Sequence, residues 1–393
     1  MAVTLADVAA RARVSAATVS RVLSGNYPVA EATRARVLAA VDELDYVING
    51  PASALAAATS DLVGVLVNDV ADPFFGIMAS AVQSELGSEK LAVVCNTGGS
   101  PERELTYLTL LLRQRAAAVV ITGSAVETPE YAAASAAKVG RLAANGTRVV
   151  LLGRPASAAP EGSAFAVEFG NREGGRRLTE HLVSLGHRRI GYVAGPADRT
   201  TTRHRLEGHR AALAAHGLGG DADAFGRLTV HGPYTRQSGY DGALELLDRE
   251  PGLTAVVGSN DAVALGICAA LREKGLDIPG DVSVAGFDDL PFSADATPAL
   301  TTVRLPLQEA AARAERLALG REESPAGGRH LVLAEVVARA STAAPRAERQ
   351  GAGTAPGRAR GGGTTCGQLC TGSALRGIFD SVKGKHAPGG GVP

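Results

Sequence analysis

The sequence lacks the long apolar segments that mark a membrane or secreted protein. Its apolar runs, such as residues 62–67, are far shorter than the roughly 20 residues that span a bilayer. Asp7 and several arginines interrupt residues 1–25, so this stretch has no apolar core of the signal-peptide kind. We therefore expect a cytoplasmic protein that does not act at a membrane.

Cysteine and clusters of catalytic residues are scarce as well. The four cysteines in 393 residues form no disulfide framework, and Cys366 and Cys370 are a single C-x3-C pair without a convincing second pair of ligands. The histidines show no metal-binding spacing. We find no nucleophile–base pair and no Walker-type or GxGxxG loop followed by a helix. The sequence thus predicts no metal, no cofactor and no enzyme activity.

Strong charge of one sign is also absent. The chain holds 40 Lys and Arg against 40 Asp and Glu, and residues 1–60 carry five arginines against five acids. Only residues 345–393 are basic, with seven Lys and Arg against two acids. Charge alone therefore does not indicate a nucleic-acid-binding protein. Apolar residues make up 45% of the chain, which at this length predicts two or three folded domains.

Three short helical patterns open the chain. The first follows Thr4, the second follows Ser15, and the third runs from about Glu31 to Leu44. Only the four residues "RARV" separate the first two, which requires a tight turn. On the second helix, Val19 and Val22 face the first. The three patterns predict a small helical head.

From Asp61 on, strand-like apolar runs alternate with amphipathic helical runs. The strand-like runs are 62–67, 91–95, 117–123, 148–153, 188–195, 254–261 and 282–289. The helical runs between them include 101–115, 171–186, 203–216, 235–249 and 262–275. This alternation predicts an α/β core of doubly wound parallel sheets with helices on both faces. About 280 residues are too many for one such sheet, so we expect two lobes.

The end of the chain differs from the core. After Thr342 the sequence becomes rich in Gly, Pro, Ala and Arg and cannot bury enough apolar surface to offset the entropy of ordering. We therefore expect a helical head over residues 1–48, a hinge or linker over 49–60, a two-lobed core over 61–344 and a disordered basic tail over 345–393.

The stretch "VSAATVSRVLSG", residues 14–25, bears most directly on function. On a helix that begins at Ser15, the side chains of Ala16, Ala17, Ser20 and Arg21 share the face opposite the apolar one. Small residues let a helix enter the DNA major groove, hydroxyls bond phosphates, and an arginine can hold a guanine by two hydrogen bonds. The same face also fits the solvated side of an ordinary three-helix bundle.

An ordered series of segments resembles the LacI/GalR family of bacterial transcriptional regulators. The segments include "TLADVAARARVSAATVSRVLSG", "LVGVLVNDVADPFF", "HLVSLGHRRIGYVAGP", "SNDAVALGICAALREKGLDIPGDVSVAGFDD" and "PALTTVRLP", and the match runs from about Val3 to Thr342. The resemblance implies a helix-turn-helix head and a periplasmic-binding-protein-like core. It also implies a repressor that binds a palindromic operator in double-stranded DNA as a homodimer and responds to a small effector, a sugar or sugar derivative.

The resemblance assigns DNA contacts to the head and the hinge. Base reading falls on Ala16, Ala17 and Arg21, of which only the arginine can donate hydrogen bonds to a base. Leu55 of the hinge helix, residues 49–58, matches the leucine that the family inserts into the minor groove, although a lone apolar residue on a short helix is the alternative. The hydroxyl side chains at the family's phosphate contacts are Ser15, Thr18, Ser20 and Thr33. Each hydroxyl could instead cap a helix or bond back to the backbone.

Two residues of the head depart from the family pattern. Arg13 stands where the family usually has glycine in the tight turn, which costs about 1 kcal/mol if its φ is positive. Ala30 replaces the usual hydroxyl cap of the third helix, at a cost of roughly 0.5–2 kcal/mol. With balanced charge as well, we expect weak non-specific DNA binding and a shallow salt dependence.

The resemblance places an effector site in the cleft between the two lobes. The residues it assigns there are Phe74, Phe75, Arg205, Tyr234, Asn260 and Asp288. Carboxylate, amide and guanidinium groups suit vicinal hydroxyls, and an aromatic face suits the C–H side of a sugar ring. Asp72 replaces a common asparagine, and "EFGN" at 168–171 lacks the usual Asp, so the effector preference can differ from that of the family.

Each assignment in the cleft has a structural alternative. Asn260 and Asp261 could only cap the helix that follows, Arg205 could pair with Glu207 or another surface acid, and the two phenylalanines could be lobe core. For the whole chain, the alternatives are a solute-binding module that has lost DNA binding and an enzyme on the same two-lobed fold. The missing signal peptide and the intact 14–25 pattern argue against the first, and the missing catalytic constellation argues against the second.

Overall fold

The computed structural model describes residues 3–24, 28–46, 60–88, 90–219 and 222–346. Leu55, almost all of the predicted hinge, the Cys366–Cys370 pair and nearly the whole predicted tail therefore lie outside the described residues. Within the described ranges, no helix is both long and apolar enough to cross a membrane.

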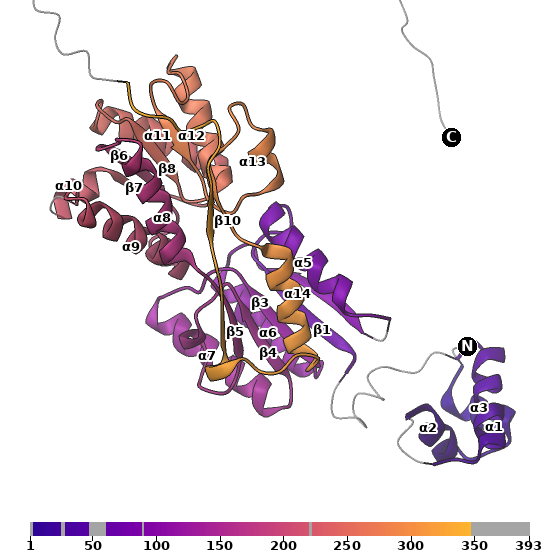
Figure 1. The fold of residues 1–393 in the computed structure, drawn as a ribbon. Helices are drawn as coiled ribbons and strands as arrows, with labels where there is room; N and C mark the ends of the chain where they lie inside the picture. The colour runs from indigo at the N-terminus through magenta and orange to yellow at the C-terminus, as the bar shows by residue number, and fades with distance from the viewer. Residues whose placement is uncertain (1–2, 25–27, 47–59, 89, 220–221, 347–393) are drawn as a thin grey trace, which may run out of the picture. The chain divides into compact units, whose positions relative to one another are not determined.

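Three short helices form the head (Figure 1). They are α1 (Leu5–Ala12), α2 (Ala16–Ser24) and α3 (Glu31–Glu43). Val8, Val19 and Val37, one from each helix, are fully buried and belong to one small apolar cluster. The three helices predicted from the sequence are confirmed to within one or two residues.

The first lobe of the core is a six-stranded parallel sheet in the order β11–β5–β4–β3–β1–β2. The strands are β1 (Leu62–Val67), β2 (Leu91–Asn96), β3 (Ala118–Thr122), β4 (Arg148–Leu152), β5 (Phe165–Phe169) and β11 (Arg329–Val332). The helical segments are α5 (Pro73–Glu85), α6 (Pro101–Arg113), α7 (Pro129–Ala144), α14 (Leu307–Ala318) and the short 3-10 turns η1 (Ala156–Ala158) and η2 (Ala326–Gly328).

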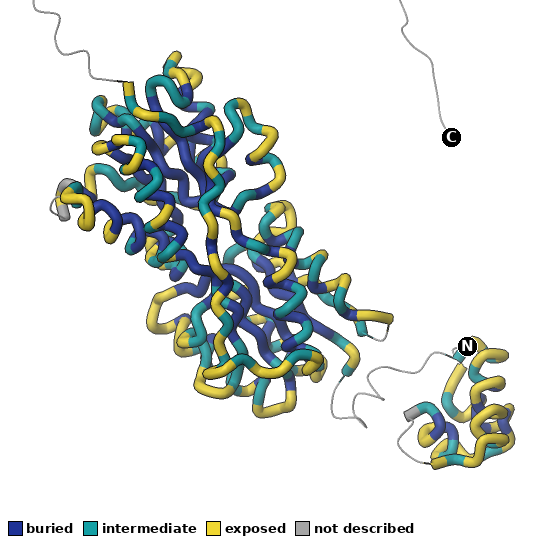
Figure 2. Tube along the Cα trace, viewed as in Figure 1, coloured by how far each residue is buried: buried dark blue, intermediate teal, exposed yellow. Residues whose placement is uncertain are grey.

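Strand β1 explains why helices cover both faces of this sheet. Val63 and Val65 point to one side and pack in the cluster that contains α5 and α14. Leu66 points to the other side and packs with α6 and α7. Because successive side chains of a strand point to opposite faces, an unbroken apolar strand requires cover on both. The strand is buried along its whole central part (Figure 2).

The second lobe repeats the arrangement on a four-stranded parallel sheet in the order β7–β6–β8–β9. The strands are β6 (Ile190–Ala194), β7 (Thr229–His231), β8 (Ala255–Gly258) and β9 (Ser283–Ala285). The helices are α8 (Asn171–Ser184), α9 (Thr200–Ala215), α10 (Ala222–Arg227), α11 (Arg236–Arg249), α12 (Asp261–Glu273) and α13 (Pro291–Asp295). Helices α8 and α9 pack together, and so do α11 and α12. The predicted two lobes of doubly wound parallel sheet are confirmed.

The chain joins the lobes at several points. It passes from β5 to α8, returns through β10 (Thr302–Arg304) to α14, and passes again from β11 to β12 (Glu335–Val337). Strands β10 and β12 pair antiparallel. This two-stranded ribbon is absent from the sequence prediction, which foresaw parallel sheets alone. In Figure 1, β10 connects the second lobe to α14, which lies beside α5 of the first.

Candidate functional site

Helix α1 begins with a capping box and ends at one strained residue, which shapes the turn to α2. Thr4 and Asp7 form a capping box, in which Asp7 N–H donates to Thr4 Oγ1 and Thr4 N–H donates to Asp7 Oδ2 at 2.8 Å. The helix ends at Arg13, whose φ of 55° and ψ of 48° lie in the left-handed region. Because the φ of Arg13 is positive, a residue other than glycine at this position destabilises the head by about 1 kcal/mol.

Helix α2 presents one apolar and one polar face. Val19 and Val22 are buried against the other helices. Ser15 accepts a hydrogen bond from Thr18 N–H at 3.2 Å and so caps the helix, while its hydroxyl lies 2.9 Å from that of Thr18. The exposed residues of this stretch are Ser15, Ala16, Ala17, Ser20 and Arg21, and Thr18 is half-buried. The structure thus brings the predicted reading residues onto one exposed face of small side chains.

No side-chain hydrogen bond caps the start of helix α3. Ala30 occupies its N-cap position and makes no side-chain hydrogen bond, as the sequence predicts. Thr33, in the first turn, is half-buried, and Arg36 Nη2 donates to its hydroxyl at 3.5 Å. The hydroxyl therefore has an acceptor role within the head as well as the phosphate contact assigned to it.

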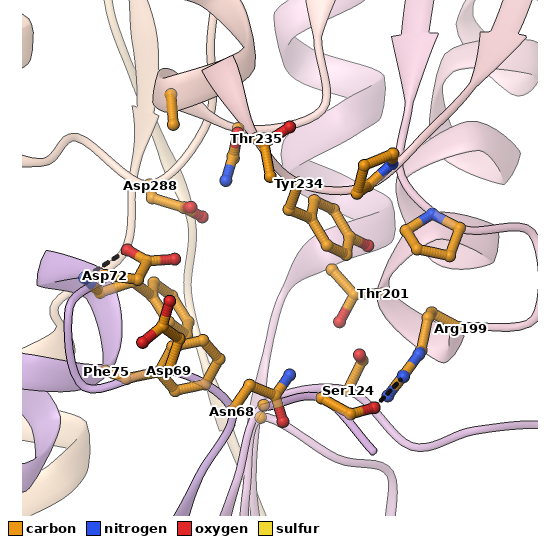
Figure 3. Close-up of a pocket in the computed structure, with 18 of the residues that line it drawn as sticks. Asn68, Asp69, Asp72, Phe75, Ser124, Arg199, Thr201, Tyr234, Thr235 and Asp288 are labelled. Atoms are coloured by element: carbon orange, nitrogen blue, oxygen red, sulfur yellow. Dashed lines mark hydrogen bonds between the residues drawn. The ribbon is translucent and has the colours of Figure 1, made fainter. Parts of the chain in front are cut away.

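A cavity of about 600 Å³ lies where the carboxyl ends of both sheets meet (Figure 3). Residues that follow β1, β3, β6 and β8 line it, as the general rule for ligand sites in parallel α/β folds requires. All six residues assigned from the sequence belong to its lining, namely Phe74, Phe75, Arg205, Tyr234, Asn260 and Asp288. We name this cavity the effector pocket.

Arg205 is the most connected side chain of the pocket. Its Nε donates to Asn171 Oδ1 at 2.8 Å, its Nη2 donates to Asp288 Oδ1 at 2.8 Å, and its Nη1 donates to Ser259 O. The guanidinium lies over the ring of Phe287, 3.7 Å from its centroid. The alternative pairing of Arg205 with Glu207 is wrong, because Glu207 pairs with Arg172 and Arg203 instead.

A close contact between α8 and α9 sets the position of Arg205. A Cβ at Gly175 would lie 2.4 Å from Arg205 O, and a Cβ at Gly208 would lie 2.0 Å from Arg172 O. Only glycine allows the two backbones to approach this closely. The approach brings Arg205 of α9 within reach of Asn171 at the start of α8.

Asp288 is held in the pocket by its backbone and its partner. Its φ of 106° is unusual for a residue with a side chain, and its N–H donates to Val303 O at 2.8 Å. Burial raises the pKa of Asp288 to about 7, while the charge of Arg205 opposes the rise. Its carboxylate is thus strongly desolvated and is balanced by a single arginine.

Asn260 and Asp261 have different roles. Asn260 Oδ1 accepts from Val263 N–H at 2.9 Å and caps α12, yet the residue also lines the pocket. Asp261 instead accepts hydrogen bonds from Leu290 N–H and from the hydroxyls of Ser293 and Thr302. Capping and a ligand contact are therefore compatible at Asn260, whereas Asp261 connects the start of α12 with α13 and β10.

Aromatic rings form much of the apolar wall. Phe74 and Phe75 meet edge to face at 5.0 Å, and Phe169 lies 6.3 Å from Phe74. Phe75 belongs to the lobe core and also lines the pocket, so a core position does not exclude a ligand contact there. Tyr234 is bonded through its hydroxyl to Thr202 Oγ1 at 2.6 Å.

Several polar residues of the lining were missed by sequence reasoning. Asn68, Asp69, Ser124, Arg199 and Thr201 surround the cavity in Figure 3. For two of them the signal was available, since Asn68 follows the strand at 62–67 and Ser124 follows the one at 117–123. Arg199 is held by a hydrogen bond from its Nη2 to Gly99 O at 2.8 Å and lies 3.8 Å from Asp198.

Two family profiles match the chain. "Bacterial regulatory proteins, lacI family" covers residues 4–49, and "Periplasmic binding protein-like domain" covers residues 179–342. The transcriptional regulator GalR of Escherichia coli (strain K12) is 35% identical over 317 residues, which is 80% of this chain and 88% of the relative. The regulator MalR of Streptomyces coelicolor is 36% identical over 356 residues, 89% of this chain and 99% of the relative.

Solved structures agree with these matches. A lac repressor dimer bound to operator and the anti-inducer ONPF is similar with a TM-score of 0.70 and 29% identity, covering 88% of this chain and all of that one. A complex of the transcriptional regulator CelR with cellobiose is similar with a TM-score of 0.62 and 31% identity, covering 86% of this chain and 99% of that one.

Proposed function

This chain belongs to the lacI family of bacterial regulatory proteins, and on that premise we propose that it represses transcription by binding a palindromic operator as a homodimer. One observation carries the proposal. A single chain combines an exposed α2 face of small residues around Arg21 with a cavity at the carboxyl ends of two parallel sheets. The first feature suits base reading in a major groove, and the second suits a small effector.

We assign base reading chiefly to Arg21, because Ala16 and Ala17 can only touch a thymine methyl. The hydroxyls of the head, on Ser15, Thr18, Ser20 and Thr33, are assigned to phosphates, and the hinge leucine Leu55 to the minor groove. The chain would act in the cytoplasm, where chromosomal operators lie, and it would catalyse no reaction.

The charges of the pocket favour a neutral sugar or sugar derivative as effector. Asp69, Asp72 and Asp288 are the acidic residues of its lining, against Arg199 and Arg205. Asp288 already balances Arg205, so a phosphate or carboxylate group would meet an excess of negative charge. Burial raises the pKa of Asp72 and the charge of Asp69 adds to the rise, so a further anion beside this wall would be disfavoured.

Effector and operator binding would be coupled through the two lobes. Phe74 and Phe75 come from the first lobe, whereas Tyr234 and Asp288 come from the second. A ligand that contacts both lobes changes the population of lobe arrangements. By thermodynamic linkage, the factor by which the ligand changes operator affinity equals the factor by which the operator changes ligand affinity.

The test is selection of bound sequences from a random duplex library with the wild type, Arg21→Ala and Arg36→Ala. We expect a palindrome for the wild type. Arg21→Ala should relax one symmetric position and cost about 1–3 kcal/mol there, because a base contact is lost. Arg36→Ala, which removes an exposed arginine of α3, should weaken all sequences alike and leave the motif unchanged.

A second arm adds effectors to the selected duplex. Neutral disaccharides should change operator occupancy, and the direction distinguishes an inducer from a corepressor. A response confined to phosphorylated sugars would refute the neutral class. A library that yields no palindrome, with or without sugars, would identify the chain as a solute-binding module that has lost DNA binding.

A further inference from the structure

A second cavity lies beside the effector pocket and shares no lining residue with it. It encloses about 240 Å³ and is lined by α7, by the loops after β3 and β4 and by the first turn of α9. An engineered protein cavity of roughly 150 Å³ already binds benzene, and ~240 Å³ corresponds to about eight liquid waters. We name this cavity the lateral pocket.

Arg154 gives the lateral pocket a buried donor. Only 3% of this residue is exposed, and its Nη1 and Nη2 donate to the two carboxylate oxygens of Glu104, each at 2.7 Å. Tyr131 also donates to Glu104. The Nε of Arg154 is buried and has no hydrogen-bond partner among the described residues. An unsatisfied donor of this kind costs about 1–3 kcal/mol, so an acceptor from a ligand would be stabilised there.

The charges around the lateral pocket are balanced in pairs. Glu104 neutralises Arg154. Burial alone would raise the pKa of Glu104, but the charge of Arg154 and the hydrogen bonds from Arg154 and Tyr131 outweigh burial and hold this pKa below its usual value. Elsewhere in the lining, the guanidinium of Arg203 donates to both carboxylate oxygens of Glu127, with contacts of 2.7–3.0 Å. Since no net charge remains, a neutral ligand fits better than an ion.

The wall between the two cavities is the junction of the lobes. Glu127 N–H donates to Asp198 O at 2.8 Å, and Ala125 N–H donates to Thr200 Oγ1 at 3.0 Å. Neighbouring residues of these segments face opposite ways. Ser124, Arg199 and Thr201 line the effector pocket (Figure 3), whereas Ala125, Thr200 and Arg203 line the lateral pocket.

We propose that the lateral pocket is a second ligand site that takes a short neutral polyol. The polyol would offer an oxygen to Arg154 Nε once the side chains that cover this atom shift, and it would lay its carbon chain against Ala136 and Leu151. Its occupant touches α7 of the first lobe and α9 of the second, so it braces the lobe arrangement from outside the effector pocket. Occupancy of the two pockets is therefore coupled.

The probe is erythritol, with tartrate as its anionic counterpart of the same four-carbon length. Binding to the full chain is followed by ligand-observed NMR and calorimetry. We expect erythritol to bind with a Kd on the order of 1 mM and tartrate to bind at least roughly tenfold more weakly. Ala136→Phe and Ser157→Phe each fill the lateral pocket, and each should abolish binding.

Two further variants locate the bound molecule. Ala137→Phe places the same ring on the exposed side of α7, outside the lining, and should bind erythritol as the wild type does. Ala262→Phe obstructs the effector pocket and should also leave erythritol binding intact. Loss of binding in Ala262→Phe alone would place erythritol in the effector pocket and refute the proposal. Absence of binding to the wild type, or equal binding of tartrate, would refute it too.

Discussion

Arg205 serves the architecture of the second lobe as well as the effector pocket. Its planar fork reaches Asn171, Ser259 and Asp288, which follow or begin three different elements. A lysine could not satisfy three acceptors in these directions at once. The stacking of the guanidinium on Phe287 adds an apolar contact on one face.

Replacement of Arg205 by leucine should destabilise the core by about 3–5 kcal/mol, because it leaves the carboxylate of Asp288 buried and unpaired. Adding Asp288→Asn to the same chain should recover part of the loss, since the buried charge is then gone. Urea unfolding followed by far-UV circular dichroism measures both values.

Arg210→Leu is the matched control for this pair of variants. Arg210 lies on the same helix and also stacks on a ring, that of Phe225, but it is exposed. Its loss should cost less than about 1 kcal/mol. Equal effects of Arg205→Leu and Arg210→Leu would show that the buried network has no special weight.

At the same scale, sequence reasoning found the site only in part. The six residues carried over from the family all line the effector pocket, yet Ser124 and Arg199 were missed. A residue at the carboxyl end of a strand can be predicted to face a cleft, as Ser124 does. Arg199 cannot, because it precedes α9 and reaches the pocket only through the junction between the lobes.

Helix α14 carries a carboxyl group that packing has isolated. Glu315 is fully buried, and neither of its oxygens has a hydrogen-bond partner among the described residues. Burial raises the pKa of Glu315 to about 7; Arg321 and Lys90 oppose the rise and Glu85 adds to it. The helix therefore holds a group whose charge is costly at neutral pH.

Glu315→Gln should change how stability depends on pH. A carboxyl with a raised folded-state pKa binds its proton more tightly in the folded chain than in the unfolded one, where its pKa is about 4.3. The stability that it contributes is full below about pH 4.3 and is lost as the pH rises through 7. Relative to wild type, the glutamine variant should thus gain about 1–3 kcal/mol between pH 4.5 and pH 8.

Urea unfolding at several pH values tests this expectation. Glu309→Gln, an exposed change on the same helix, should give a profile parallel to that of the wild type. If the Glu315→Gln profile were parallel as well, the carboxyl group would not titrate in this range, and its burial would have no energetic consequence.

Elements with strong periodicity were predicted well, and short ones were not. The run at 62–67 coincides with β1 because unbroken apolar residues favour a buried strand. Five strands were not among the predicted runs, namely β5, β7, β10, β11 and β12, and three of these have only three residues, too few to show a period. Helix α5 was not named among the predicted helical runs, although Asp72 caps it and Pro73 opens it.

For the whole molecule, length and alternation sufficed to predict two lobes, but not how they are joined. The antiparallel pairing of β10 with β12 brings residues 302–304 and 335–337 together, some thirty positions apart. No local pattern encodes a contact between segments so distant in sequence. The lateral pocket could not be predicted from the sequence either, because it forms only where the two lobes meet.

The charge of the whole molecule determines how strongly its non-specific DNA binding depends on salt. The described part of the head carries as many acids as arginines, and Arg11 is paired with Glu43. Residues 347–393 add six Lys and Arg against two acids. On the chain shortened after Arg346, the slope of log K against log salt for non-specific duplex should therefore be shallower than about −5. The full chain should show a steeper slope, because its extra cations release further counterions.

Fluorescence anisotropy on a random-sequence duplex at 50–200 mM salt, roughly the range in which such slopes are defined, measures both slopes. A steep slope on the shortened chain would mean that the head neutralises many more phosphates than its balanced charge allows.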